Sequence, residues 1–224
     1  MGSKNKLKRF KENETFVNVF QPTREEVVSD QFSMKGKWNT DFFKNDHPIV
    51  LELGCGKGEY SIGLAERNPN KNFIGIDIKG ARFWRGAKTA VENRLHNVAF
   101  LRTQIELIDQ CFAPNEVSEI WITFPDPQIK YKRTKHRMTN AVFLSNYKKI
   151  LKPSGLMHLK TDSEFMHGYT LGLLHGAGHE VLYANHNIYL NEGAPAEVTG
   201  IQTFYESQYL EVNKPITYIQ FRIL

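Results

Sequence analysis

The chain has few cysteines and no long apolar run. Cys55 and Cys111 are the two cysteines among 224 residues, and their spacing does not suit a metal site. One pair gives no disulfide framework in a chain of this size, so a reducing cytoplasm fits best. No run approaches the roughly 18 apolar residues that a membrane span needs, and the basic N-terminus lacks the apolar region of a secretory signal. We therefore expect a cytoplasmic protein without a metal or a membrane partner.

Acidic residues are missing between Asp126 and Arg137, and cations gather there. Before Arg137 the stretch contains Lys130, Lys132, Arg133, Lys135 and His136. A second basic group lies near the N-terminus, at Lys4, Lys6, Lys8, Arg9 and Lys11. The formal net charge is only +5, so the uneven placement matters more than the total. Such clusters are typical of phosphate binding, whereas a solubilising surface with a floppy tail is the alternative interpretation.

Strand and helix patterns alternate along most of the chain. The pattern predicts strands at 49–53, 72–78, 97–103, 119–124, 156–161, 181–184 and 215–224. It predicts helices within 21–38 and at 59–67, 80–95, 106–112, 139–151 and 163–176, with 187–207 as loop. Short, continuously apolar strands are typical of a parallel sheet with crossover helices. We predict an α/β, Rossmann-like fold with a mostly parallel seven-stranded sheet and helices on both faces. A single domain, 21–224, follows a flexible basic arm, 1–20.

A glycine-rich turn connects the first strand of this pattern to the first helix. Gly54, Gly56 and Gly58 have the spacing G-x-G-x-G, which differs from the G-x-G-x-x-G of dinucleotide enzymes. Glycines permit tight turns and close approach of a ligand, here at a helix N-terminus. Glu52 precedes the turn, and an acid there suits an amine-bearing ligand better than a phosphate. An ordinary strand-to-helix turn with an incidental acid is the alternative.

The next two strands end in polar side chains that suit a nucleoside. Asp77 ends the second strand, where a carboxylate typically accepts hydrogen bonds from both ribose hydroxyls. Gln104 follows the third strand, where its carbonyl oxygen suits an adenine amino group. An amine, a ribose and no phosphate together describe S-adenosyl-L-methionine. The sequence therefore predicts a binding site for this methyl donor.

The strand at 119–124 stops at Pro125-Asp126-Pro127, and the basic stretch follows at once. Ligands of open α/β sheets bind in the crevice at the carboxyl ends of the strands. Asp126 is thus expected in the same crevice as Asp77, with cations beside it. This arrangement indicates a reaction on a polyanion.

Five segments together resemble the bacterial tRNA (guanine-N7-)-methyltransferase family. They are LELGCGKGEY at 51–60, FIGID at 73–77, TFPDP with the basic run at 123–137, HLKTD at 158–162, and TFYE at 203–206. The resemblance covers residue 49 to the C-terminus. The glycine turn alone is generic to class I methyltransferases, whereas the combination is specific. The chain departs from the family at Gln128-Ile129, where relatives usually have Trp-Pro, and at Gln104, where they commonly have Asp.

The resemblance implies transfer of a methyl group from S-adenosyl-L-methionine to N7 of a tRNA guanosine, usually position 46 in the variable loop. It implies cofactor contacts for Glu52, Gly54, Gly56, Gly58, Asp77, Gln104 and Asp126, and a catalytic role for Asp126. It implies substrate contacts for Lys130, Asp162, Thr203, Phe204, Tyr205 and Glu206, and RNA contacts for Lys132, Arg133, Lys135, His136 and Arg137. Either a monomer or a homodimer fits the sequence.

The chemistry of the reaction restricts what these residues do. Guanine N7 has no proton, so its methylation needs no general base at the attacked atom, and a nearby carboxylate favours the positive charge that develops. We predict that Asp126 or Asp162 reads the Watson–Crick edge of an unstacked guanine, with Tyr205 in the same pocket.

Each of these residues also has a structural alternative. Asp126 would cap its own turn, Asp162 would be a helix N-cap, and Thr203 with Glu206 would form a capping box. Trp121 and Phe124 are expected in the core. Two rival functions stay open: a methyltransferase acting on another RNA, a small molecule or a protein, and an RNA-binding module without catalysis.

Overall fold

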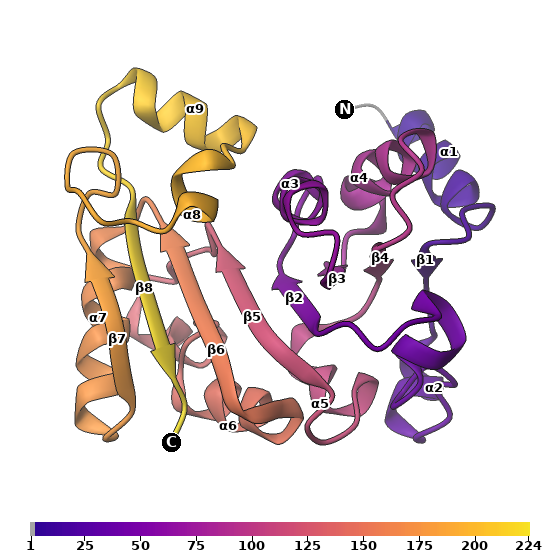
Figure 1. The fold of residues 1–224 in the computed structure, drawn as a ribbon, viewed down its shortest axis with the longest axis horizontal. Coiled ribbons are helices and arrows are strands. Elements are labelled where there is room, and N and C mark those ends of the chain that lie inside the picture. The colour runs from indigo at the N-terminus through magenta and orange to yellow at the C-terminus, as the bar shows by residue number, and fades with distance from the viewer. Residues whose placement is uncertain (1–2) are drawn as a thin grey trace.

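The structure is a computed structural model that describes residues 3–224. Its centre is one sheet in the order β1-β4-β3-β2-β5-β6-β8-β7, shown in Figure 1. In that order the strands are Val19–Phe20, Val98–Leu101, Asn72–Ile76, Ile49–Leu53, Val117–Thr123, Leu151–Thr161, Thr217–Arg222 and Glu180–Asn185. The first six are parallel, and β8 is antiparallel to both β6 and β7. The predicted α/β fold with a mostly parallel sheet is confirmed.

The sheet has one strand more than the seven predicted, within the described residues. The additional strand, β1, pairs Val19 with Phe100 and Phe20 with Leu101 at the edge of β4. Two residues are too few to give a periodic pattern, so the sequence carried no signal for this strand.

Helices cover both faces of the sheet. The α-helices are α1 Ser3–Asn13, α2 Arg24–Val28, α3 Glu59–Arg67, α4 Gly80–Glu92, α5 Ile108–Cys111, α6 Ala141–Ile150, α7 Glu164–Gly176, α8 Ala196–Gly200 and α9 Phe204–Glu211. Three short helices of other types are η1 Trp38–Phe43, η2 Ile105–Leu107 and η3 Tyr131–His136. None of the helices in residues 3–224 is long and apolar enough to cross a membrane.

The two faces of the sheet have different interiors. One face packs apolar side chains of β2, β5 and β6 against α2, α5, α6 and α7, with Leu51, Ile120 and Leu159 among them. The other face packs against α3, α4, α8 and α9. Buried polar side chains of β2, β5 and β6 are also found there, including Glu52, Thr123 and Lys160. All residues of β2, β3 and β4 are buried, as covering on both faces requires.

The stretch 1–20, predicted as a flexible arm, includes one helix and one short strand among its described residues. Residues 3–13 form α1, which packs on α4: Glu12 accepts a hydrogen bond from Trp84 Nε1 at 2.9 Å and pairs with Lys88 at 3.3 Å. Asn13 donates to the backbone oxygen of Gly80 at 3.0 Å. Residues 1–2 and the side chains of 3–4 lie outside the described part. Mobility of the arm stays a prediction, as does the domain boundary at residue 21.

Two further segments differ from the expected elements. The stretch 187–207, predicted as loop, contains α8 and the start of α9. Their short apolar patterns gave little signal, but Thr203 and Glu206 form the capping box that opens α9. The strand predicted at 156–161 is longer in the structure, because β6 begins at Leu151.

Candidate active site

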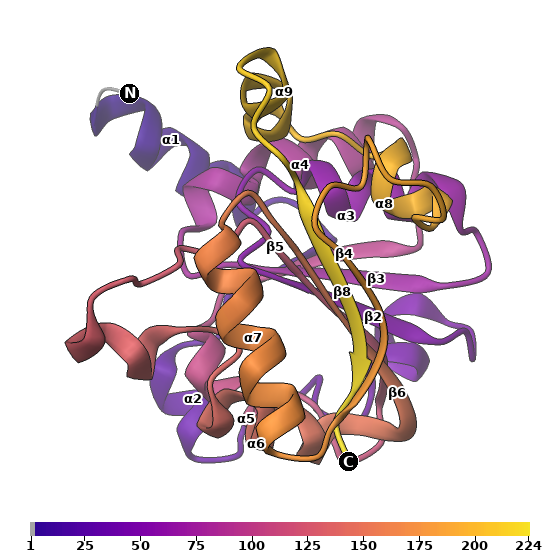
Figure 2. The same ribbon diagram turned by 90° about the vertical axis from the view of Figure 1, so that its left-hand side faces the viewer.

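The carboxyl ends of β2 to β6 meet at one edge of the sheet, and α9 lies above the ends of β5 and β6 (Figures 1 and 2). Because these strands are parallel, the residues that follow them are brought together. The glycine turn follows β2, Asp77 follows β3, Gln104 follows β4, Asp126 follows β5, and Asp162 follows β6. The structure therefore brings the sequence-predicted residues to one edge.

The glycine turn is fastened to β3 through its backbone. Ile76 O accepts hydrogen bonds from the N–H groups of Gly54 at 2.8 Å and Cys55 at 3.0 Å. Gly54, Gly56 and Gly58 have φ of 74°, 56° and 77°, a region in which side chains are strained. A Cβ on Gly58 would lie 2.6 Å from the Phe100 ring, whereas one on Gly56 would meet only Gly54 O, at 3.9 Å. Gly58 is therefore required by packing, and Gly56 faces open space.

Asp77 holds this turn in place. Its carboxylate accepts from the N–H of Gly56 at 3.1 Å and of Lys79 at 2.7 Å, and the residue is only 7% exposed. Each carboxylate oxygen has further acceptor capacity. The half-exposed side chain of Ile78 follows directly and gives an apolar wall beside the carboxylate.

Glu52 is a buried carboxylate held by hydroxyl and amide donors. Its Oε2 accepts from Ser61 N at 2.8 Å and Ser61 Oγ at 2.5 Å, and its Oε1 accepts from Thr123 Oγ1 at 2.6 Å. Burial raises the pKa of Glu52 to about 7, although these donors oppose the shift. Glu52 thus joins β2, α3 and β5 beneath the glycine turn.

A cavity of about 710 Å³ opens between the glycine turn, the start of α4, α1 and α9. It is lined by Gly56, Lys57, Glu59, Ile78, Lys79, Ala81, Arg82, Trp84, Arg85, Arg102 and Tyr205, and by Lys6, Arg9 and Phe10 of α1. Its volume lies in the range of small-molecule sites. Gln104 lines an adjoining hollow of about 270 Å³ with Ile78, Arg102 and Thr103. The predicted adenine side therefore lies outside the main cavity and adjoins it at Ile78 and Arg102.

The loop after β5 presents Asp126 to solvent. Phe124 and Gln128, which flank it, have φ of 48° and 47°, which is rare for non-glycine residues. Asp126 Oδ1 accepts from Gln128 N at 3.0 Å, so the predicted turn-capping role is present. One hydrogen bond leaves the exposed carboxylate free for further partners.

Most of the basic stretch lies on the surface, but Arg137 does not. Lys130, Lys132, Arg133, Lys135 and His136 are exposed, on or beside η3. Arg137 is 6% exposed and donates to the backbone oxygens of Gln128 and Ile129, each at 3.2 Å. Its guanidinium carbon also lies 4.8 Å from the ring centre of Phe165 and 4.4 Å from that of Tyr169. In this conformation Arg137 supports the loop, and its predicted phosphate contact is not accessible.

Asp162 directly follows β6, and the segment 203–206 opens α9. Asp162 is ion-paired with Lys214, and the N-cap of α7 is Ser163, so Asp162 is not the N-cap. Thr203 and Glu206 form a capping box, and both Phe204 and Tyr205 are about half exposed. The capping-box alternative is therefore confirmed.

Glu206 has a second role that the sequence did not reveal. It is completely buried, and its carboxylate pairs with Lys160 Nζ at 2.7 Å and accepts from Tyr189 OH at 2.7 Å. Lys160 also donates to the backbone oxygens of Val198 and Ile201 at 2.6 and 3.0 Å. This buried pair fixes α8 and α9 to the end of β6. The single signal was the lysine in HLKTD, which is unusual in an otherwise apolar strand.

The start of α9 also contacts the glycine turn. The N–H of Phe204 donates to Glu59 Oε2 at 3.0 Å, and Lys57 Nζ lies 4.1 Å from the Phe204 ring centre. Lys57 and Glu59 were not predicted, because lysine and glutamate at a helix start are ordinary surface residues. Through them the segment 203–206 reaches the rim of the main cavity.

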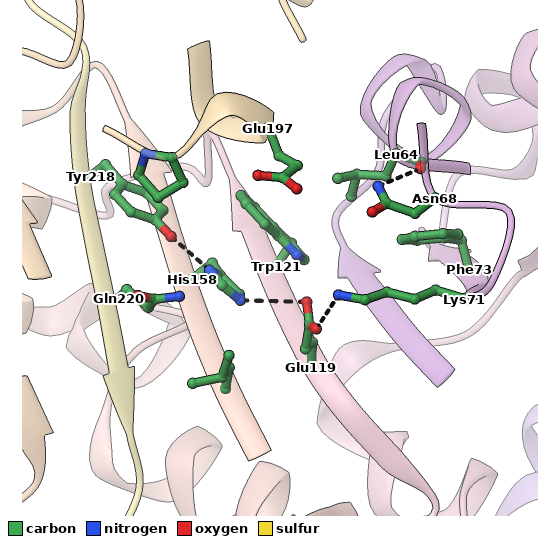
Figure 3. Close-up of a pocket in the computed structure, with 12 residues that line it drawn as sticks. Leu64, Asn68, Lys71, Phe73, Glu119, Trp121, His158, Glu197, Tyr218 and Gln220 are labelled. Atoms are coloured by element: carbon green, nitrogen blue, oxygen red, sulfur yellow. Dashed lines mark hydrogen bonds and ion pairs between the residues drawn. The ribbon is translucent and has the colours of Figure 1, made fainter. Parts of the chain in front are cut away.

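A separate polar cluster lies on the same face of the sheet, away from these residues (Figure 3). Glu119 pairs with Lys71 at 2.5 Å and lies 3.7 Å from His158 Nε2, and His158 Nδ1 is 2.7 Å from Tyr218 OH. Trp121 stacks on His158, with ring centres 4.0 Å apart. Burial, with Lys71 nearby, lowers the pKa of His158 to about 3. None of the predicted site residues lines the 160 Å³ cavity at this cluster.

Comparison with known proteins agrees with this geometry. A family profile described as "Putative methyltransferase" matches residues 46–219. Among solved structures, the 16S rRNA methyltransferase KamB aligns with 84% of this chain and 94% of its own, at a TM-score of 0.62 and 14% identity. A SAM-dependent methyltransferase from Aquifex aeolicus aligns over 98% of both chains, at a TM-score of 0.54 and 16% identity. At these identities the two structures bear on the fold alone.

The fold and the site at its carboxyl edge define a class I methyltransferase that uses S-adenosyl-L-methionine. A tRNA (guanine-N(7)-)-methyltransferase of Christiangramia forsetii is 76% identical over 223 residues, which cover all of both chains. One of Porphyromonas gingivalis is 52% identical over 93% of this chain and 85% of the relative. The chain belongs to the tRNA (guanine-N(7)-)-methyltransferase family.

Proposed function

We propose that this protein transfers a methyl group from S-adenosyl-L-methionine to N7 of a guanosine in tRNA, at position 46 as the family resemblance implies. The observation that carries the proposal is the meeting of two features at one edge of the sheet. The glycine turn with Asp77 suits the methyl donor, and the exposed cations of 130–136 suit a polyanionic substrate. Family membership agrees with both. We expect the reaction to take place in the cytoplasm, by a monomer or a homodimer.

The residues present fit the methyl donor. Gly56 leaves open space where a side chain would stand, and Asp77 has acceptor capacity for ribose hydroxyls beside the apolar wall of Ile78. Glu52 lies beneath the turn, where its ionised form would favour the ligand's amine, and Gln104 lies on the adenine side. When bound, the cofactor supplies an electrophilic methyl group on a sulfonium.

Asp126 is the residue to which we assign catalysis. It is exposed at the end of β5, on the same edge as Asp77, and its loop has fixed geometry. Positive charge develops on the guanine as N7 gains the methyl group, and a carboxylate placed there stabilises it. Most of the remaining rate enhancement comes from orienting N7 toward the methyl group.

Asp162 is our second candidate for reading guanine. Its carboxylate is paired with Lys214, so it must exchange this partner, or share it, when it accepts from the guanine N1–H and amino groups. In the sequence, Lys130 lies between Asp126 and the cationic segment. The half-exposed Tyr205 lines the main cavity, where a flat base can stack on it, and the half-exposed Phe204 precedes it.

The exposed cations of η3 would grip the tRNA backbone without choosing the base. Each phosphate contact adds roughly 0.7–0.9 to the slope of log K against log salt. Replacing Lys132, Arg133 and Lys135 together by alanine should therefore flatten that slope by about two to three units. An unchanged slope would remove these cations from the RNA interface.

Incubation of bulk tRNA with labelled methyl donor, followed by nucleoside analysis, tests the central proposal. We expect label in 7-methylguanosine, absent when heat-denatured protein is used. Label in another nucleoside, or in a small molecule or protein of the extract, would support a rival methyltransferase. S-adenosylhomocysteine calorimetry separates both from an RNA-binding module, which would bind no cofactor.

A further inference from the structure

An open cleft lies between the first half of α7 and the loop that leads into and out of η3. It has a volume of about 570 Å³ and is lined by Ile129, Tyr131, Arg137, Glu164, Phe165, Gly168 and Tyr169. Figure 2 shows the loop extending away from the sheet beside α7. The cleft shares none of its lining residues with the cavity at the glycine turn. It is therefore a separate feature, on the same side of the molecule as the basic stretch.

Arg137 makes the walls of this cleft rigid. Its guanidinium carbon lies over the rings of Phe165 and Tyr169, which are 6.4 Å apart and inclined by only 16°. The same side chain donates to the backbone oxygens of Gln128 and Ile129. Because one buried cation holds both walls, the cleft is formed without a ligand.

The rim of the cleft exposes three apolar side chains to solvent. Tyr131 is 92% exposed, Ile129 65% and Phe165 41%. A grouped set of exposed apolar side chains marks a binding surface more often than a scattered one does. A Cβ on Gly168 would meet no atom within 4 Å, so the wall of the cleft is open at this position.

The charges around the cleft indicate which class of ligand it binds. Lys130, Lys132, Arg133 and Lys135 are exposed around Tyr131, and Glu164 is the one acid among the lining residues. Aromatic side chains between cations are typical of surfaces on which unstacked bases lie while their phosphates meet the cations. A protein partner with an apolar patch has no need of these four positive charges.

We propose that this cleft binds an unstacked nucleobase of the tRNA, distinct from the guanosine that is methylated. The base stacks on Tyr131 and Phe165, and its flanking phosphates lie on the cations of η3. This inference rests on the proposed function, because it takes tRNA as the ligand. Its effect is to fix the register of the tRNA on the protein at a second point beside the active site.

Binding of unmodified tRNA to Tyr131→Ala tests the inference. Stacking is worth about 1–3 kcal/mol per base, so the affinity should fall by roughly 5- to 150-fold, and Tyr131→Phe should retain it. Because stacking is not ionic, the slope of log K against log salt should stay unchanged, unlike that of the Lys132-Arg133-Lys135 variant. Unchanged affinity of Tyr131→Ala would overturn the inference.

A matched pair on α7 gives an independent test. Gly168→Leu fills the cleft, whereas Gly172→Leu adds the same side chain one turn along, also where no atom lies within 4 Å, but outside the cleft. Gly168→Leu should weaken tRNA binding and Gly172→Leu should not. Equal affinities would overturn the inference, as would a cleft variant that changes the sedimenting mass without changing tRNA affinity, because a second copy would then be the occupant.

The two proposals fail in different ways. If the wild-type protein forms no 7-methylguanosine in tRNA, the proposed function is wrong. If the wild type methylates tRNA and the cleft variants bind it as tightly as the wild type does, the function stands and only the cleft assignment is wrong.

Discussion

The two halves of the carboxyl edge hold their carboxylates in opposite ways. On the cofactor half, Glu52 and Asp77 are buried, and their partners are hydroxyls and backbone N–H groups. On the substrate half, Asp126 is exposed with one backbone partner, and Asp162 has a partly exposed lysine. The difference shows that the first pair builds the frame of the site, whereas the second pair is free to exchange partners.

Among substitutions that test the difference between the two halves, Asp126→Asn should have the largest effect, a loss of catalytic rate. Asparagine keeps an oxygen for the Gln128 N–H, so the loop keeps its shape while the charge is lost. Removing one electrostatic contact to a transition state costs about 10²–10³ in kcat. We expect a loss of this size in single-turnover methylation, with tRNA affinity nearly unchanged. A variant of full activity with unchanged cofactor binding would end the catalytic assignment.

Glu52→Gln tests the buried carboxylates of the cofactor half through the pH dependence of stability. The folded-state pKa of Glu52 is raised from 4.5 to about 7, so its contribution to stability is present below pH 4.5 and is lost as pH rises toward 7. The folded-state pKa of His158 is lowered from 6.5 to about 3, so its contribution is present above pH 6.5 and is lost as pH falls. Between pH 4.5 and 6.5, Glu52 therefore lowers the free energy of unfolding as pH rises, whereas His158 raises it.

The Glu52→Gln variant loses the contribution of Glu52 to this pH dependence and keeps that of His158. Relative to the wild type, its free energy of unfolding should rise by about 3 kcal/mol between pH 4.5 and 6.5, at 1.36 kcal/mol per pH unit for each full proton. Urea denaturation at several pH values measures this, with Glu66→Gln on the exposed face of α3 as the control. Parallel pH curves for variant and wild type would mean that Glu52 is not held as a buried acid.

Asp77→Asn should weaken cofactor binding without affecting RNA. A charge-assisted hydrogen bond contributes about 1.5–3 kcal/mol, so the affinity for S-adenosylhomocysteine should fall at least about tenfold. Calorimetry measures this, and Glu92→Gln on the exposed side of α4 is the control. If tRNA affinity fell instead, the division of the edge into two halves would be wrong.

Lys214→Ala should have the smallest effect. Its pair with Asp162 is partly exposed, and such pairs contribute about 0.2–1 kcal/mol to stability. Thermal denaturation should show a loss within that range, with unchanged affinity for S-adenosylhomocysteine. A loss above roughly 2 kcal/mol would mean that Asp162, like Glu52, has a structural role. Asp162 would then not be free to exchange Lys214 for guanine.

The sequence predicted this edge because its residues sit next to strong local signals. Glu52, Asp77 and Asp126 each lie at or beside the end of an apolar strand, and parallel strands bring such ends together. The partners of these residues could not be predicted in the same way. Ser61 and Thr123 hold Glu52 across 9 and 71 residues of chain, and no local pattern encodes such contacts.

Arg137 and Glu206 also show that the sequence does not reveal the partner of a charged residue. Both stand in motifs that indicate ligand binding, yet each is buried and bonded within the protein. The sequence pattern of such a motif is the same whether the charged residue binds a ligand or another residue of the chain. The structure distinguishes the two roles, because Arg137 packs against α7 and Glu206 pairs with Lys160 of β6.

The contact between Arg137 and the loop after β5 has a consequence for substitutions in that loop. Arg137 holds the backbone oxygens of residues 128 and 129 and touches neither side chain through these bonds. Both bonds use main-chain atoms, so the hold of Arg137 on the loop does not depend on which side chains residues 128 and 129 carry. The left-handed φ of Gln128, 47°, is a separate constraint that any substitution at this position has to satisfy.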